Sequence, residues 1–295
     1  MIRVRRIAHA SYETPDVERQ VAYYTDVLGL TLVAKEKDAA YLACTLDHHN
    51  VVLCRGAAPK CVRLGFQIAP TDDLGDFERQ ISAHGVKTQR KKDPEPSIAE
   101  LVSFEDPKGT LIEVFKEREF SGQRYPAKGI VPHKLGHVAF HVNDVKGITK
   151  FYCDVLGFRE SDWMADFFSF LRCGPDHHTI NLINTGQTRL HHTAFELRDW
   201  AHMETACDYL SLNGYPLIWG PGRHGIGHNL FAYHKNPDGL IVELFAELDQ
   251  MQDEELGYFA PRPWHRDRPQ RPKVWPKDPS AANLWGIMPP DEMMK

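Results

Sequence analysis

Two histidines and one glutamate have the types and the settings of metal ligands. His137 and His192 each begin the same pattern, His-x-Ala-Phe. Glu243 lies in LIVELF between two apolar residues, and such a carboxylate must either point outward to water or find a strong partner inside the fold. Two neutral imidazoles and one carboxylate form the facial triad that holds iron(II) and leaves coordination positions open for a substrate and dioxygen.

Each of these residues also has an ordinary structural explanation, because a single strand histidine is commonly packed or solvated and a strand glutamate can face solvent. An internal repeat favours the metal site. AYYTDVLGL (22–30) returns as KFYCDVLGF (150–158), and EDPKGTLIEVF (105–115) returns as KNPDGLIVELF (235–245). His9 returns 128 residues later as His137. The candidate ligands therefore occupy matched points of a duplicated unit.

The two copies differ at one ligand position. His9 pairs with His137 and Glu113 pairs with Glu243, but Arg63 stands opposite His192. The first copy therefore has His, Arg and Glu where the second has His, His and Glu. We expect an N-terminal copy that is metal-free and keeps a relict site, and a C-terminal copy that binds the metal.

The elements that must position these residues recur in both copies. Alternating apolar residues in LGHVAFHV predict a strand over 135–142, followed by a helix with Asp144 as N-cap and Gly157 at its end. Two strand–helix–strand–strand–strand units are expected in each copy, which is an α+β fold. Further strands are expected near 159–164, 167–173, 178–184, 229–235 and 240–246, and the first copy is expected to have strands 5–12 and 62–68 with helices 15–28 and 72–84.

Bulk properties exclude several classes of protein. The chain has 295 residues, a net charge of −5 and no dense cluster of Lys and Arg, which argues against nucleic-acid binding. No apolar run is long enough for a membrane span, and the N-terminal residues lack the apolar core of a signal peptide. The six cysteines form no CxxC pair, as expected for reduced thiols in the cytoplasm.

The repeat and the composition divide the chain into four parts. We expect an N-terminal domain over 1–118, a linker over 119–134, a catalytic C-terminal domain over 135–248 and a tail over 249–295. The tail is rich in proline but contains Trp264, Trp275 and Trp285. These large apolar side chains favour a tail that packs on the body or on a neighbouring subunit over a free one.

Three stretches carry a resemblance to a known family: LGHVAFHV, RLHHTAFEL and GPGRHGIGHNLFAYHKNPDGLIVELF. They resemble the type I extradiol ring-cleavage dioxygenases (catechol 2,3-dioxygenase-like) of the vicinal oxygen chelate, or glyoxalase–bleomycin resistance, superfamily. The resemblance implies two tandem vicinal-oxygen-chelate domains, each a partly open β-barrel of paired βαβββ units. It also implies Fe(II), with Mn(II) as an alternative, bound by His137, His192 and Glu243. His192 is preferred to His191 because it has the same place before Ala-Phe as His137.

The same resemblance implies the catalytic residues. The acid–base histidine falls on His178, which fits the family's register better than His177, and two further active-site residues fall on His224 and Tyr233. His178 is expected to take a proton from a catechol and return it later. His224 and Tyr233 are expected to donate hydrogen bonds to the substrate oxygens. The glycines around His224 suit a loop, and no helix follows them, so a dinucleotide site is not expected.

The expected partners are a catecholic small molecule and O2, with no nucleic acid and no membrane. A homo-oligomer is expected, with a tetramer favoured. Two alternatives stay open: another metalloenzyme of the superfamily, such as a glyoxalase-like isomerase or thiol transferase, and a non-catalytic binding protein. The physiological catechol is also open. Several aromatic residues could line its pocket or belong to the core: Trp163, Phe167, Phe168, Phe170 and Trp219.

Overall fold

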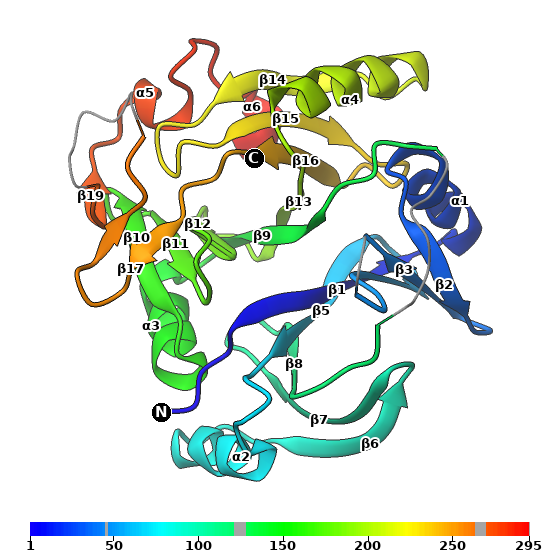
Figure 1. Cartoon of the computed structure of the whole chain (residues 1–295), viewed down its shortest axis with the longest axis vertical. Helices are drawn as coiled ribbons and strands as arrows, with labels where there is room; N and C mark the ends of the chain where they lie inside the picture. The colour runs from blue at the N-terminus through cyan, green and yellow to red at the C-terminus, as the bar shows by residue number, and fades with distance from the viewer. Residues whose placement is uncertain (45–46, 121–127, 263–269, 295) are drawn as a thin grey trace.

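Two curved sheets, one from each half of the chain, form the body of the protein (Figure 1). The computed structural model describes residues 1–44, 47–120, 128–262 and 270–294. The N-terminal sheet has the order β2-β3-β4-β1-β5-β8-β7-β6, and the C-terminal sheet has the order β14-β15-β16-β13-β9-β12-β11-β10-β19. Each sheet thus joins two βαβββ units through a central antiparallel pair, β1 with β5 and β9 with β13.

The four units follow one another along the chain. The N-terminal half contains β1 (Arg6–Thr14), α1 (Val17–Ala22), the π-helical η1 (Tyr23–Val27), β2 (Thr31–Lys35), β3 (Ala39–Ala43), β4 (Val51–Arg55), β5 (Lys60–Gln67), α2 (Leu74–Ala83), β6 (Gln89–Glu95), β7 (Ile98–Glu105) and β8 (Leu111–Phe115). The C-terminal half contains β9 (Lys134–Val142), α3 (Val145–Leu156), β10 (Arg159–Met164), β11 (Phe168–Arg172), β12 (Ile180–Asn184), β13 (Arg189–Glu196), α4 (Trp200–Leu212), β14 (Leu217–Arg223), β15 (Leu230–Lys235) and β16 (Ile241–Ala246). The predicted α+β class and the paired units are confirmed.

Helix α3 shows how local sequence sets the element boundaries. The side chain of Asp144 accepts a hydrogen bond from the backbone N–H of Gly147 at 2.9 Å, which caps the first turn. Gly157 ends the helix in the left-handed conformation with φ 73°, where a side chain would be unfavourable. Both boundary predictions are confirmed.

Two predicted elements differ from the structure. The helix expected over 15–28 is α-helical only to Ala22 and continues as the π turn of η1. The stretch expected to be a loop before His224 is largely the strand β14. β14 is the edge strand of the sheet, with β15 as its neighbour. Pro221 has no backbone N–H, and at an edge no strand on the other side needs a hydrogen bond from it.

The two halves share one apolar core. Two buried hydrogen bonds also join them, from Tyr12 Oη to Thr193 Oγ1 at 2.5 Å and from Tyr23 Oη to His234 Nε2 at 2.6 Å. No helix in the described part of the chain is both long and apolar enough to cross a membrane.

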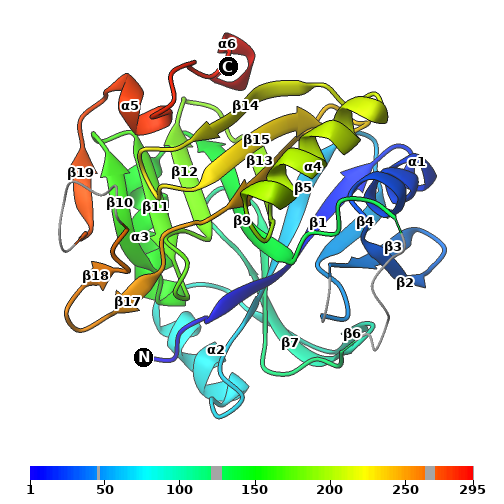
Figure 2. The ribbon, with the colours of Figure 1, turned by 45° about the horizontal axis from the view of Figure 1, so that its top comes forward.

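The tail lies against the C-terminal half, as Figure 2 shows. Its elements are β17 (Met251–Asp253), β18 (Tyr258–Phe259), β19 (Lys273–Trp275), α5 (Pro279–Ala282) and α6 (Asp291–Met294). Strand β19 extends the large sheet by pairing with β10. Trp275 Nε1 donates to Asp162 Oδ2 at 2.7 Å, and Trp285 packs edge-on against Trp200. Trp264 lies outside the described residues.

Candidate metal centre and catalytic pocket

Three neighbouring strands bring the predicted ligands together. His137 lies on β9, His192 on β13 and Glu243 on β16, and these strands are adjacent in the sheet. His137 Nε2 lies 3.2 Å from His192 Nε2 and 3.0 Å from Glu243 Oε2, while His192 Nε2 lies 3.1 Å from the same oxygen. Metal–ligand bonds of about 2.1 Å at right angles would place ligand atoms about 3 Å apart. The three atoms therefore fit one face of an octahedral ion.

An irregularity in β13 turns two consecutive histidines toward the same space. The register with β9 shifts between Leu190 and His192, so that His191 is the extra residue of a bulge. His191 and His192 both line the same cavity. His191 Nδ1 contacts His192 Nδ1 and does not join the three converging atoms.

Charge and burial suit a cation at this position. His137, His192 and Glu243 are buried, and the second carboxylate oxygen of Glu243 accepts a hydrogen bond from Asn229 Nδ2 at 3.0 Å. Burial alone would raise the pKa of the Glu243 carboxyl, but the facing imidazoles of His137 and His192 outweigh it and hold that pKa well below its usual range. The site is thus an ionised carboxylate with two imidazoles, a donor set suited to a divalent metal.

His178 lies beside this group, and His177 lies behind it. The ring of His178 is 4.4 Å from that of His137, centre to centre, and it lines the cavity. Its Nδ1 is 2.9 Å from Nδ1 of His177, whose Nε2 is 3.1 Å from Asp162 Oδ2. Burial and the nearby His137 lower the pKa of His178 well below its usual value. His178 is therefore neutral near pH 7, with Nε2 left for the cavity.

His224 and Tyr233 lie on the other side of the ligands and contact each other. Tyr233 Oη is 3.0 Å from His224 Nε2, and His224 Nδ1 is 2.6 Å from the carbonyl oxygen of Ala282 in the tail. Burial lowers the pKa of His224 to about 4. In the neutral ring Nδ1 donates to the carbonyl, so Nε2 accepts from the tyrosine hydroxyl.

A cavity of about 370 Å³ joins these residues. Its walls are mainly apolar and aromatic, which is typical of a small-molecule site. The lining includes Phe167, Phe168, Phe170, Trp219, Ile226 and Met288. Trp163, also considered as pocket-lining from the sequence, instead packs against the main core. The tail supplies one wall through α5 and α6.

Sequence reasoning missed several supporting residues. Asn229 contacts Glu243, Ala282 contacts His224, and Asp162 contacts His177 behind His178. Each is far from its partner in the sequence or has a common type. Of these three residues, only Asp162 could have been noticed in the sequence, because it is a carboxylate inside the strand predicted near 159–164. Ala282 acts through its backbone and leaves no signal at all.

Comparison with known proteins places the chain in a family. The manganese-dependent 2,3-dihydroxybiphenyl 1,2-dioxygenase of Geobacillus genomosp. 3 is 25% identical, over 92% of this chain and 93% of that protein. Metapyrocatechase 2 of Cupriavidus necator is 27% identical, over 83% of this chain and 82% of that protein.

A solved structure is also similar along its length. The crystal structure of the Mn(II)-bound glyoxalase from Novosphingobium aromaticivorans has a TM-score of 0.87 and 28% identity, over 99% of this chain and 94% of that one. The sequence model of the Glyoxalase/Bleomycin resistance protein/Dioxygenase superfamily matches residues 6–114 and 134–244. Since this match covers most of the chain, the protein belongs to that superfamily.

Proposed function

We propose that the protein is an extradiol dioxygenase that opens a catechol ring beside its two hydroxyls, with Fe(II), or alternatively Mn(II), held by His137, His192 and Glu243. One observation carries the proposal. Three ligand atoms 3.0–3.2 Å apart face a cavity that a neutral histidine also lines. When bound, the metal supplies positions for both catechol oxygens and for dioxygen, and it lowers the pKa of the coordinated hydroxyls.

His178 is proposed as the base that takes the catechol proton, and its neighbours prepare it for that task. The carboxylate of Asp162 accepts a hydrogen bond from the Nε2–H of His177, so a neutral His177 has its lone pair on Nδ1. His178 Nδ1 must then donate to His177 Nδ1. This leaves the lone pair of His178 on Nε2, the nitrogen available to the cavity. A proton accepted there can be returned later in the reaction.

His224 and Tyr233 are proposed to form hydrogen bonds on the other side of the substrate. Both were expected to donate hydrogen bonds to it. In the observed arrangement the Nδ1 proton of His224 is committed to Ala282, so Tyr233 holds the proton between the two residues. Tyr233 has a single hydroxyl proton, so it donates to a substrate oxygen only when this proton turns away from His224, and His224 becomes a donor only after its Nε2 accepts a proton.

The cavity favours a catechol with an apolar substituent. Its walls beyond the ligands are formed by phenylalanine, methionine and isoleucine side chains, with Phe168 and Phe170 stacked at 4.3 Å. Lys277 is the one lysine or arginine among the described residues that line it, and its ammonium lies over the Phe167 ring at 4.8 Å beside Asp278. An alkyl or aryl group gains from these walls, whereas a carboxylate would lose hydration there.

Oxygen consumption tests the function. Protein purified without oxygen and loaded with Fe(II) should consume O2 when given 3-phenyl- or 3-alkylcatechol and give a yellow ring-opened product. His178→Phe should keep the metal and lose turnover by about 10²- to 10⁴-fold. A metal-loaded protein that consumes no oxygen with any catechol would refute the proposal.

A glyoxalase-like isomerase is the competing function, favoured by the name of the structural relative from Novosphingobium aromaticivorans. The hemithioacetal of methylglyoxal and glutathione distinguishes the two, because its isomerisation consumes no oxygen. The cytoplasmic location and the homo-oligomer, with a tetramer favoured, also remain predictions. Light scattering of the purified protein tests the assembly.

A further inference from the structure

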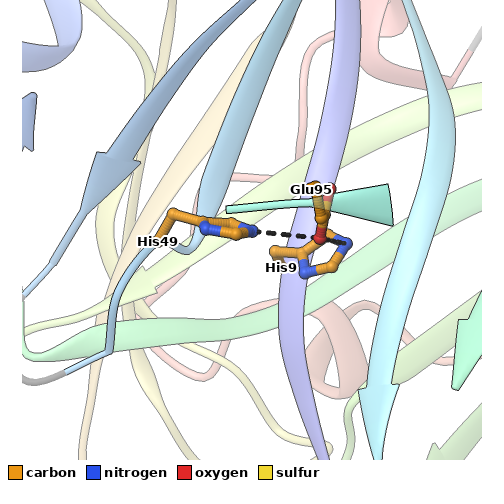
Figure 3. Close-up of side chains that lie close together, drawn as sticks. All are labelled: His9, His49 and Glu95. Carbon is orange, nitrogen blue, oxygen red and sulfur yellow. Dashed lines mark hydrogen bonds and ion pairs between the residues drawn. The ribbon is translucent and has the colours of Figure 1, made fainter. Parts of the chain in front are cut away.

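A second group of buried histidine and glutamate side chains converges in the N-terminal domain (Figure 3). His9 lies on β1, His49 in the turn before β4, and Glu95 at the end of β6. Both imidazoles direct Nε2 at the same carboxylate oxygen: Glu95 Oε1 is 3.6 Å from His9 and 3.3 Å from His49. In the repeat His9 corresponds to the ligand His137, whereas DHH (47–49) recurs as DHH (176–178), so that His49 corresponds to His178 and not to a ligand.

The contacts of these imidazoles are longer than charge-assisted hydrogen bonds, and this holds also for a second carboxylate beside His9. Glu113 Oε2 on β8 is 3.4 Å from His9 Nε2. A charge-assisted N–H···O bond is shorter, about 2.7–2.9 Å, as His228 and Asp249 illustrate at 2.7 Å. Tetrahedral ligands with bonds of about 2.0–2.1 Å lie about 3.3–3.4 Å apart. The spacing in the N-terminal group therefore fits ligands around a tetrahedral ion better than direct hydrogen bonds.

Two cations already face these carboxylates. Arg63 Nη1 lies 3.7 Å from Glu95 Oε2 and 3.2 and 3.3 Å from the two oxygens of Glu113. The partly buried Arg118 interacts electrostatically with Glu95 and donates to the carbonyl oxygen of His49 at 2.7 Å. Arg63 contacts Oε2 of Glu95, while the histidines face Oε1. The guanidinium thus leaves the oxygen between the two imidazoles available.

We propose that the N-terminal domain binds a zinc-like divalent cation through His9, His49 and Glu95. Three protein ligands leave one position of a tetrahedral ion to water. The ion would join β1 and the turn before β4, from the first βαβββ unit, to β6 of the second. The sequence predicted a metal-free domain because Arg63 replaces one ligand, whereas this site uses His49 and Glu95 instead. It is independent of the proposed catalytic function.

Zinc binding to the full-length protein tests the proposal. The Glu243→Ala variant removes the C-terminal site and leaves the N-terminal group intact. We expect dialysed wild-type protein to bind two equivalents of Zn²⁺ and Glu243→Ala to bind one. Adding His49→Ala or Glu95→Gln to Glu243→Ala should abolish the remaining equivalent. The matched controls His84→Ala and Glu105→Gln, at exposed positions of the same domain, should retain it.

Cobalt provides a second measurement that reports geometry. Co²⁺ in the Glu243→Ala variant should give the intense visible absorption of tetrahedral coordination, and Zn²⁺ should displace it and raise the melting temperature. If the folded Glu243→Ala variant binds neither ion, the proposal is wrong, and Arg63 and Arg118 alone balance the carboxylates. That titration decides the question even if the double variants fail to fold.

Discussion

Replacing Asp162 with asparagine tests the role of His178 as proton acceptor. Asp162 contacts His177, which contacts His178, and Asp162 itself does not line the cavity. Asp162 accepts from three donors: the Lys273 backbone N–H at 2.8 Å, Trp275 Nε1 at 2.7 Å and His177 Nε2 at 3.1 Å. An asparagine has only one oxygen in place of two. If that oxygen takes the place of Oδ2, it still accepts from Trp275 and His177, while the NH₂ group faces the backbone N–H of Lys273. A neutral acceptor binds the Nε2–H of His177 more weakly than a carboxylate, so the preference for this tautomer, and with it for the lone pair of His178 on Nε2, is reduced.

The size of the effect follows from the lost charge of the acceptor. A hydrogen bond to a charged group contributes about 1.5–3 kcal/mol and one between neutral groups about 0.5–1.5 kcal/mol, and each 1.4 kcal/mol is a factor of ten in an equilibrium. The preference for His178 with its lone pair toward the cavity should therefore fall by about 5- to 10-fold in Asp162→Asn. We expect kcat for a catechol to fall by a similar factor.

Oxygen uptake at saturating catechol, together with metal analysis, measures this effect. Asp166→Asn is the matched control, because Asp166 lies on the same hairpin and is exposed. Trp275→Phe removes one donor but keeps the carboxylate, so its turnover should stay within about threefold of the wild type. Unchanged turnover in a metal-loaded Asp162→Asn protein would refute the assigned direction of the hydrogen bonds.

Three further predictions concern acid stability, metal affinity and the substrate. Burial lowers the pKa of His234 to about 3 in the folded protein, from an ordinary 6.5. As the pH falls below 6.5, the His234 side chain is therefore protonated in the unfolded chain but not in the folded protein, and the folded protein loses stability. Urea unfolding should show a loss from this group of about 2 kcal/mol between pH 7 and pH 5, and His234→Gln should remove it. Asn229→Ala removes the bond to Glu243 Oε1 and should weaken Fe(II) binding by about 10- to 100-fold in a competition titration; unchanged affinity would contradict its supporting role. Phe168→Ala should lower kcat/KM for 3-phenylcatechol by about 3- to 10-fold through the lost aromatic contact and leave that for unsubstituted catechol nearly unchanged; equal losses would argue against an aromatic subsite.

The site residues that could be predicted from the sequence lie at positions that the repeat matches between its two copies. His137, His192 and Glu243 could be matched because each lies on a strand whose partner in the first copy is aligned by neighbouring motifs. Register then carries them together, since Ala194 of β13 pairs with both His137 and Glu243. A pattern of period two along strands was sufficient for that inference.

The residues that sequence reasoning missed depend on contacts between segments without a common pattern. Asp162 on β10 contacts His177, which lies just before β12, and Glu95 at the end of β6 contacts His49 in the turn before β4. Neither pair has a spacing that a strand or helix imposes. Strand β14 was missed for a different reason, because its glycines and proline are typical of loops and only its position at the sheet edge makes them tolerable.

A single Cβ atom accounts for part of the divergence between the two copies. His137 faces Ala194 on β13, whereas His9 faces Gly65 on β5 at the same point of the first copy. A Cβ at Gly65 would lie 2.2 Å from the ring of His9, so that ring occupies space that a side chain fills in the C-terminal domain. His9 can therefore pack closer to its neighbouring strand and turn Nε2 toward Glu95. The first copy thus has an arrangement of its own, in which Arg63 binds Glu113 at the point where His192 lies beside Glu243 in the second copy.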